Sequence, residues 1–124
     1  MENRSIAEQR LFLMGKVLTY LRQDVEENIS QSGELKESVA VRCEVTGTKD
    51  HEYLFGIRED PANPKGLLLQ TSVHRKGYDM VVSNYVPMGT KQELLDELDH
   101  MIENPEECVE EILQLSDRLA ESYE

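Results

Sequence analysis

The chain has 124 residues, of which 39% are hydrophobic and 31% are charged. This composition is too apolar for general disorder and supplies enough apolar residues for one buried core, so we expect a single α+β domain over residues 1–124. The formal net charge is −12 at pH 7. Most of it lies in residues 88–124, where twelve Asp and Glu oppose only Lys91 and Arg118. A field of this sign opposes approach to a polyanion.

The first predicted element is a helix that begins after Ser5. Ser5 and Glu8 have the spacing of a capping box, in which each residue satisfies a free backbone N–H of the helix start. Apolar residues then recur at steps of three or four, as on one buried helix face. They are Leu11, Met14, Val17, Leu18, Leu21, Val25 and Ile29. Because charged residues interrupt this stretch, we expect neither a signal peptide nor a membrane span.

The middle of the chain has the alternating pattern of half-buried strands. Four runs show it: Val39–Val45, Tyr53–Ile57, Leu67–Val73 and Tyr78–Val86. Turns rich in Gly, Pro, Asp and Asn separate them, as in antiparallel hairpins. The sequence therefore predicts a four-stranded meander, preceded by a linker or turn at residues 30–34.

Two helices are predicted after the sheet. Thr90 with Glu93, and Asn104 with Glu107, repeat the capping spacing. Pro105 takes a first helical position, and the residue before a proline avoids the α region, so we expect a sharp break there. The two apolar stripes are Leu94, Leu95, Leu98, Met101 and Ile102, and then Val109, Ile112, Leu113, Leu119, Ala120 and Tyr123. The expected fold class is α+β, with an N-terminal helix, a four-stranded antiparallel meander sheet and two C-terminal helices.

The second face of the predicted sheet is less polar than a solvated face should be. Leu54, Leu68, Val81 and Tyr85 lie opposite the side chains assigned to the core. Either the first helix covers one face and the C-terminal helices the other, or a second chain covers this face. Because symmetric dimers are common and the first helix has a wide apolar stripe, we expect a homodimer.

The cysteines and histidines are the candidate metal ligands. Cys43 and His51 lie eight residues apart, as do His100 and Cys108, whereas paired ligands in structural zinc sites are usually about two to five residues apart. We interpret both cysteines as buried apolar residues of a reducing cytoplasm, and the histidines, His74 included, as surface or strand-edge residues. We expect no metal and no cofactor, and we place the chain in a bacterial cytosol.

Two other function classes remain as alternatives. The sequence has no Gly-x-Ser-x-Gly elbow, no glycine-rich phosphate loop and no His-Glu-x-x-His motif, so an enzyme would be one of unknown reaction. A single-stranded nucleic-acid binder would use the sheet, aromatic residues and basic turns. The residues in question are Arg58, Lys65, His74, Arg75 and Lys76, with Tyr53, Tyr78 and Tyr85. The net charge makes nucleic acid an unfavourable partner.

The acidic helical pair is the strongest functional signal. Its charge exceeds what solubility requires in a small domain, and it fits a basic segment of another protein or mimicry of a nucleic-acid-binding site. A solvated outer face is the competing interpretation. The candidate docking residues are Asp96, Glu103, Glu107, Glu110, Glu111 and Asp117, with Leu54, Leu68, Val81 and Tyr85 on the sheet face. We therefore expect a small acidic protein-binding module: an adaptor, a chaperone-like protein, or an inhibitor of the immunity type.

This profile, with its long amphipathic first helix, antiparallel sheet and C-terminal helix, is similar to that of secretion chaperones, which dimerise and hold an effector segment. The similarity covers composition and element order. It departs where those chaperones place a helix within the strand run, because Arg75, Lys76 and Gly77 leave no room for one. Immunity proteins and anti-factors share the same profile.

Overall fold

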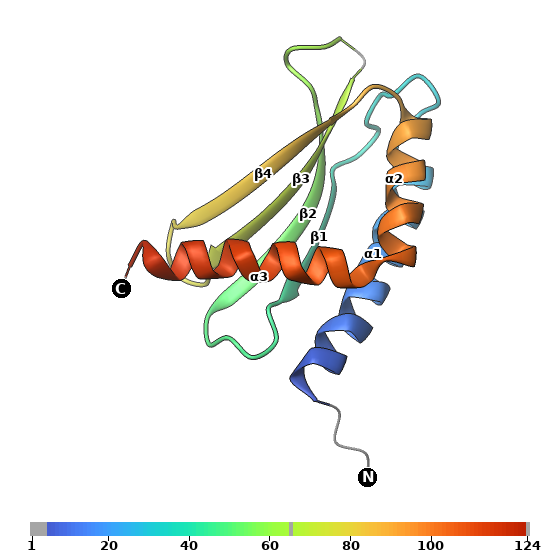
Figure 1. Ribbon diagram of the computed structural model, residues 1–124. Helices are drawn as coiled ribbons and strands as arrows, with labels where there is room; N and C mark the ends of the chain where they lie inside the picture. The colour runs from blue at the N-terminus through green and yellow to red at the C-terminus, as the bar shows by residue number, and fades with distance from the viewer. Residues whose placement is uncertain (1–4, 65, 124) are drawn as a thin grey trace.

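The computed structural model describes residues 5–64 and 66–123. Its elements are α1 (Ile6–Asn28), β1 (Val39–Glu44), β2 (His51–Glu59), β3 (Leu67–Arg75), β4 (Val81–Met88), α2 (Lys91–Glu103) and α3 (Pro105–Glu121) (Figure 1). The strands pair antiparallel in the order β1-β2-β3-β4. The predicted α+β fold, with one helix before a meander sheet and two after it, is confirmed.

Two of the predicted caps begin their helices as expected. The Ser5 hydroxyl accepts a hydrogen bond from the Glu8 backbone N–H at 3.1 Å, and the Thr90 hydroxyl accepts one from the Glu93 N–H at 3.1 Å. The Glu93 carboxylate in turn accepts from the N–H of Gly89 at 3.0 Å. The two bonds to Ser5 and Thr90 satisfy N–H groups that a helix start leaves free, so they define where α1 and α2 begin.

The predicted break at Asn104 and Pro105 is confirmed, since α2 ends at Glu103 and α3 begins at Pro105. The capping role predicted for the Asn104 side chain is wrong. Its amide donates to the backbone oxygen of His100 at 2.9 Å and so closes the end of α2 instead of opening α3. The proline supplies the start of α3 without that bond.

The last strand lies further along the chain than predicted. It begins at Val81 instead of Tyr78 because residues 76–80 form the turn between β3 and β4. In this turn the Tyr78 N–H donates to the Arg75 oxygen at 3.1 Å, and Gly77 has a φ of 81°, which glycine adopts without strain. The strand continues through Pro87 to Met88. Residues 30–34 form the expected turn, closed by a hydrogen bond from the Ser30 N–H to the Glu34 oxygen at 2.8 Å.

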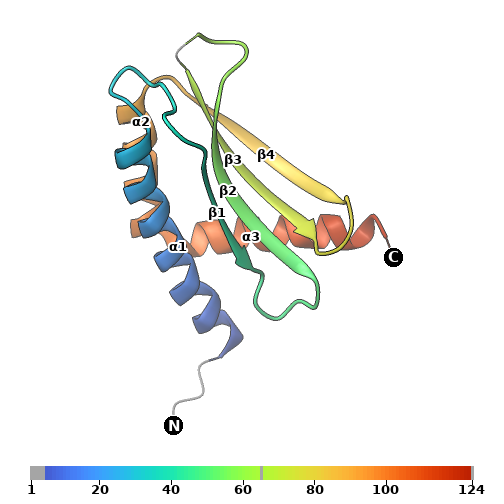
Figure 2. The same ribbon diagram turned by 180° about the vertical axis from the view of Figure 1, so that it is seen from behind.

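All three helices pack on one face of the sheet (Figures 1 and 2). There α1 lies against β1 and α2, and α3 crosses β3 and β4. The buried strand side chains on this face include Val39, Tyr53, Phe55, Ile57, Leu67, Leu69, Thr71 and Val73. Most side chains that alternate with them are half-buried or exposed. The arrangement with helices on both faces is therefore wrong, and in the described part of the chain the second face of the sheet stays uncovered.

The helix stripes were predicted well, with two differences. Leu11 is exposed at 38%, although it was expected in the buried stripe of α1. The first turns of α1 project beyond α3 (Figure 1). In α3, Leu115 and Ser116 are buried although neither was in the predicted stripe. The remaining stripe residues of α1 are buried as expected: Met14, Val17, Leu18, Leu21, Val25 and Ile29. Within residues 5–64 and 66–123, none of the helices combines the length and apolar character needed to cross a bilayer.

Candidate functional site

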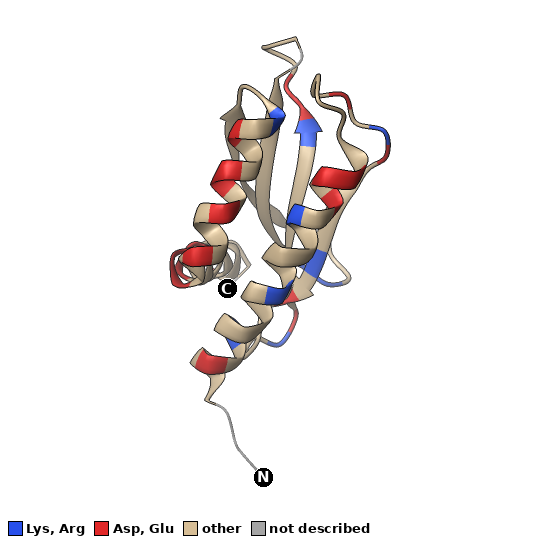
Figure 3. Ribbon diagram, turned by 90° about the vertical axis from the view of Figure 1, so that its right-hand side faces the viewer, with Lys and Arg blue, Asp and Glu red and all other residues tan. Residues whose placement is uncertain are grey.

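The predicted acidic surface is present on α2 and α3. Figure 3 shows Asp and Glu positions, in red, along α2 and at the start of α3. Five of the six predicted carboxylates are exposed, and Glu111 is half-buried. Lys91, one of two cations in this part of the chain, is buried and donates from Nζ to the Glu26 oxygen near the end of α1 at 3.1 Å. Because this cation is used inside the fold, it contributes little to the charge of the outer surface.

A groove lies between α2, α3 and the β3–β4 part of the sheet. In Figure 1 these elements bound a triangular area, with β4, α2 and α3 as its sides. The groove has a volume of about 140 Å³. Its apolar lining consists of Leu69, Val86, Met88, Met101 and Cys108, and its polar lining of Thr71, Glu97, His100, Glu107 and Glu111. We call this feature the acidic groove.

Three separate parts of the chain build the acidic groove. Positions i, i+3 and i+4 share a helix face, so Glu97, His100 and Met101 form one wall from α2. The sharp break at residue 104 starts α3 in a new direction, and residues 107, 108 and 111 form the second wall. Antiparallel pairing places Leu69 opposite Val86 in the floor.

The electrostatics of the acidic groove favour cations. Burial, as the largest cause, and the carboxylates of Glu111, Glu107, Glu97 and Glu106 together raise the pKa of the Cys108 thiol to about 12. A thiolate at residue 108 is therefore disfavoured by a negative potential as well as by burial. The same potential attracts a positive side chain placed at the mouth of the groove.

One hydrogen bond and one ion-pair contact position the walls. The Asn84 side-chain amide of β4 donates to a Glu111 carboxylate oxygen at 3.3 Å, which holds this carboxylate over the sheet. His100 Nε2 lies 3.6 Å from a Glu107 carboxylate oxygen, so a protonated His100 forms an ion pair across the two helices. Both contacts are exposed or half-buried, which leaves the carboxylates accessible to a partner.

The size of the acidic groove restricts what it can bind. Pockets for drug-sized ligands and cofactors measure about 300–1,000 Å³, roughly two or more times its volume. An engineered cavity of about 150 Å³ holds a benzene molecule. The acidic groove is therefore of the right size for a single apolar side chain.

The predicted sheet-face residues do not form one patch. Leu68 and Tyr85 line a shallow hollow with Arg58, Glu59 and Pro61 at one end of the open face. Val81 lies at the other end of β4, paired with His74. Leu54 lies on β2 between Arg42 and Ser72. Polar side chains separate the apolar ones: Gln70, Ser72 and Ser83.

The basic residues near the turns are largely paired with acidic or aromatic groups. The Glu52 carboxylate lies 3.1 Å from His74 Nε2 and 3.6 Å from Lys76 Nζ. The Arg75 guanidinium lies 3.9 Å from the ring centres of both Tyr78 and Tyr123. Lys65 lies outside the described residues. These contacts reduce the positive charge available to a nucleic acid.

His51 was predicted at the surface or a strand edge, and this prediction is wrong. His51 is only 5% exposed. Its Nδ1 lies 2.6 Å from the Ser116 hydroxyl, and its Nε2 lies 2.7 Å from the Tyr123 hydroxyl. Burial lowers the pKa of His51 and favours the neutral ring. Because Ser116 is itself 4% exposed in the middle of α3, this serine–histidine pair links α3 to β2 and is closed to a substrate.

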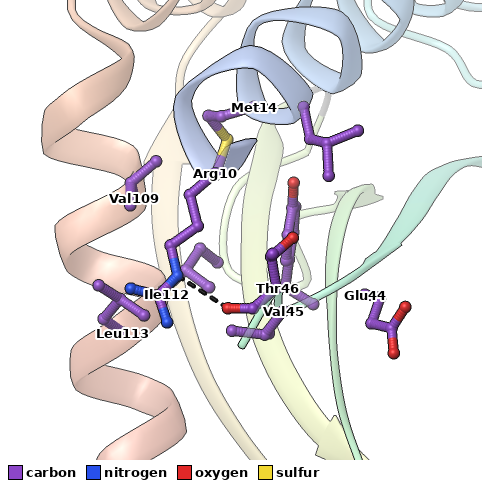
Figure 4. A pocket seen from close by; sticks show the side chains of 10 residues that line it. Arg10, Met14, Glu44, Val45, Thr46, Val109, Ile112 and Leu113 are labelled. Carbon is purple, nitrogen blue, oxygen red and sulfur yellow. Dashed lines mark hydrogen bonds between the residues drawn. The ribbon is translucent and has the colours of Figure 1, made fainter. Parts of the chain in front are cut away.

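A narrow crevice beside α1 is too small for a ligand (Figure 4). It lies between Arg10 and Met14 of α1, the end of β1 and α3, and its volume is about 10 Å³. A water molecule needs about 10–15 Å³ on this scale. The Arg10 Nε donates to the Thr46 oxygen at 2.8 Å across one side of the crevice, so the crevice is a packing gap.

The cysteines differ in their surroundings. Cys108 is buried as predicted, whereas Cys43 is half-buried on the edge strand β1 and both are free thiols. Within residues 5–64 and 66–123, no group of three or more His, Cys, Asp or Glu is placed to hold a metal ion. Both ring nitrogens of His51 have protein partners, which leaves that ring without a free nitrogen for a metal.

Comparisons of the chain with protein-family models, curated proteins and solved structures found no match. The chemistry of the acidic groove is therefore the basis for a functional proposal. Of the predicted docking residues, the structure brings Glu107 and Glu111 into this groove, and the other four carboxylates lie outside its lining. Glu97 and His100 were missed, although their spacing from Met101 on one helix face was visible in the sequence.

Proposed function

We propose that this protein binds a basic segment of another protein in the acidic groove. One apolar side chain of the segment occupies the floor, and Lys or Arg side chains on either side lie beside Glu97, Glu107 and Glu111. The observation that carries the proposal is the combination of an apolar floor with carboxylate walls in a single hollow. Free cysteines support a reducing cytoplasm as its location.

The energetics of the acidic groove indicate weak, selective binding. Full burial of one apolar side chain stabilises a complex by about 1.5–3 kcal/mol. Each exposed ion pair adds about 0–1 kcal/mol. Micromolar affinity needs about 8 kcal/mol in total, so the partner requires further contacts beyond the groove. An adaptor, a chaperone-like protein and an inhibitor all fit this description.

The test uses a synthetic peptide in which Lys and Thr alternate, with a Leu in place of the central Lys. We expect it to bind the wild-type protein in a calorimetric titration and to bind less tightly as salt rises, since salt screens exposed charges. Replacing the Lys residues with Glu should abolish binding.

Two protein variants locate the binding site. Glu97→Lys with Glu107→Lys reverses two walls of the groove, and we expect it to weaken binding by about tenfold or more. Glu110→Lys with Asp117→Lys is the matched control, because it makes the same change of net charge on exposed residues outside the groove lining. Wild-type affinity in the first variant, equal losses in both variants, or no binding of the peptide to the wild-type protein would refute the proposal.

A further inference from the structure

The strand β4 lies at one edge of the sheet. Its single neighbour among the described strands is β3. Val81, Tyr85 and Val86 of β4 are all about half exposed, between 46% and 56%. Natural edge strands are usually protected from pairing by charged side chains or by prolines. The β4 sequence Val-Val-Ser-Asn-Tyr-Val-Pro-Met has no charged residue, and Pro87 is its single proline.

The register shows which backbone groups of β4 are free. The Arg75 N–H donates to the Met80 oxygen at 3.1 Å, which makes these two residues a hydrogen-bonded pair. Such pairs alternate along an antiparallel ladder, so Val82, Asn84, Val86 and Met88 direct their backbone groups to β3. The residues between them, Val81, Ser83, Tyr85 and Pro87, direct theirs to the outer edge. Pro87 agrees with this assignment, because a proline is tolerated where no ladder N–H is needed.

We infer that β4 pairs with a basic, extended segment of a partner protein, which adds a fifth strand to the sheet. This inference rests on the proposed binding at the acidic groove and names how the same segment is held. The N–H groups of Val81, Ser83 and Tyr85 form the hydrogen bonds, and Pro87 ends the pairing at one side. These backbone contacts supply the affinity that a single anchor side chain lacks.

Charge decides the kind of segment that β4 accepts. Side chains on the helix side of an added strand lie beside Asn84 and Val86, next to the carboxylate of Glu111 and near the exposed Glu107. Lys or Arg at alternate positions therefore faces carboxylates. A second copy of this chain is a poor fit, because pairing two β4 edges about a two-fold axis brings two acidic α3 helices to the same face.

The first test uses the Lys-and-Leu peptide described above in two further versions, each with N-methyl groups on alternate backbone nitrogens. Every second N–H of an added strand faces β4, so one version blocks the hydrogen bonds to β4 and the other blocks only the outer edge. We expect the version that blocks the hydrogen bonds to β4 to bind more weakly by about tenfold or more, and the version that blocks the outer edge to bind like the unmethylated peptide. If the two versions bind with equal affinity, whether both bind like the unmethylated peptide or both fail to bind, strand addition is wrong.

The second test changes the protein. Ser83→Pro removes an outward N–H while the ladder with β3 is kept, and Ser83→Ala is the matched control that keeps the N–H. We expect about tenfold weaker peptide binding in the first variant and unchanged binding in the second. Wild-type affinity of a folded Ser83→Pro protein would overturn the inference. If Ser83→Pro does not fold, the N-methylated peptides decide alone.

The two proposals can fail separately. Suppose that the Glu97→Lys, Glu107→Lys variant loses binding while the two methylated peptides bind equally. The groove is then the binding site, and strand addition is wrong. Unchanged binding in that variant would show that the acidic groove is not the binding site. If Ser83→Pro converts a dimer of the free protein to a monomer, a second copy occupies the edge and the inference is wrong.

Discussion

The buried hydrogen bond between Ser116 and His51 makes a sharp prediction for stability. Replacing Ser116 with Ala removes the hydroxyl that lies 2.6 Å from His51 Nδ1 and leaves this nitrogen without its partner. A buried polar group left unpaired costs about 1–3 kcal/mol, so we expect the free energy of unfolding to fall by that amount in a urea titration followed by circular dichroism. Ser83→Ala on the open sheet face is the control and should change it by less than about 0.5 kcal/mol. A Ser116→Ala protein as stable as the control would refute the packing role of this pair.

The same site predicts how stability depends on pH. Burial lowers the pKa of His51; Asp50 and Asp117 oppose this shift, and Arg75 adds to it. The unfolded chain, with an ordinary histidine pKa near 6.5, then binds more protons than the folded chain between the two pKa values. Stability therefore rises with pH through this window and is lost as pH falls below about 6.5. His51→Gln removes this titration, so its loss of stability between about pH 7.5 and 5.5 should be smaller than that of the wild type. Equal slopes would contradict the assignment.

Three further predictions concern the core, metals and assembly. Leu98→Ala removes a fully buried side chain and should cost about 2–5 kcal/mol in the same urea titration; near-wild-type stability would contradict the packing described here. Elemental analysis of protein purified without chelator or affinity tag should find less than one equivalent of zinc, and stoichiometric zinc would overturn our interpretation of the cysteines and histidines. Light scattering should find a homodimer, since the second sheet face is uncovered in the described residues, and a 14.3 kDa species would exclude it.

The element order was predictable because each element has a strong local signal. Ser5 and Thr90 begin helices through hydrogen bonds to residues three positions ahead, and such contacts are encoded within four residues. Asn104 shows the limit of this reasoning. Its sequence context fits a helix start, but the same amide also reaches the His100 oxygen at the end of the preceding helix. Sequence spacing cannot decide whether the side chain accepts from an N–H of the helix that follows or donates to a carbonyl of the helix that precedes it.

The burial of His51 was predictable from its position and was missed because of its residue type. His51 has the same strand phase as Tyr53 and Phe55, which are core residues of β2. Alternation therefore places its side chain toward the helices. Histidine is intermediate among residues in how often it is buried. The hydrogen-bond partners that offset the cost of burying this ring are Ser116 and Tyr123, which lie far away in the sequence. Strand alternation was therefore a better predictor of the burial of His51 than its residue type.

The position of the acidic groove depends on contacts that no local pattern encodes. The sequence indicated the sign of the charge on α2 and α3, and the corner at residue 104 decides which carboxylates converge. Glu97 and Glu107 come from different helices and meet over Leu69 and Val86 because all three helices lie on one face of the sheet. Had α3 crossed the opposite face, the same carboxylates would lie apart and β4 would have no acidic helix beside its free edge. The side of the sheet on which α3 packs therefore decides whether these carboxylates converge in one groove beside β4.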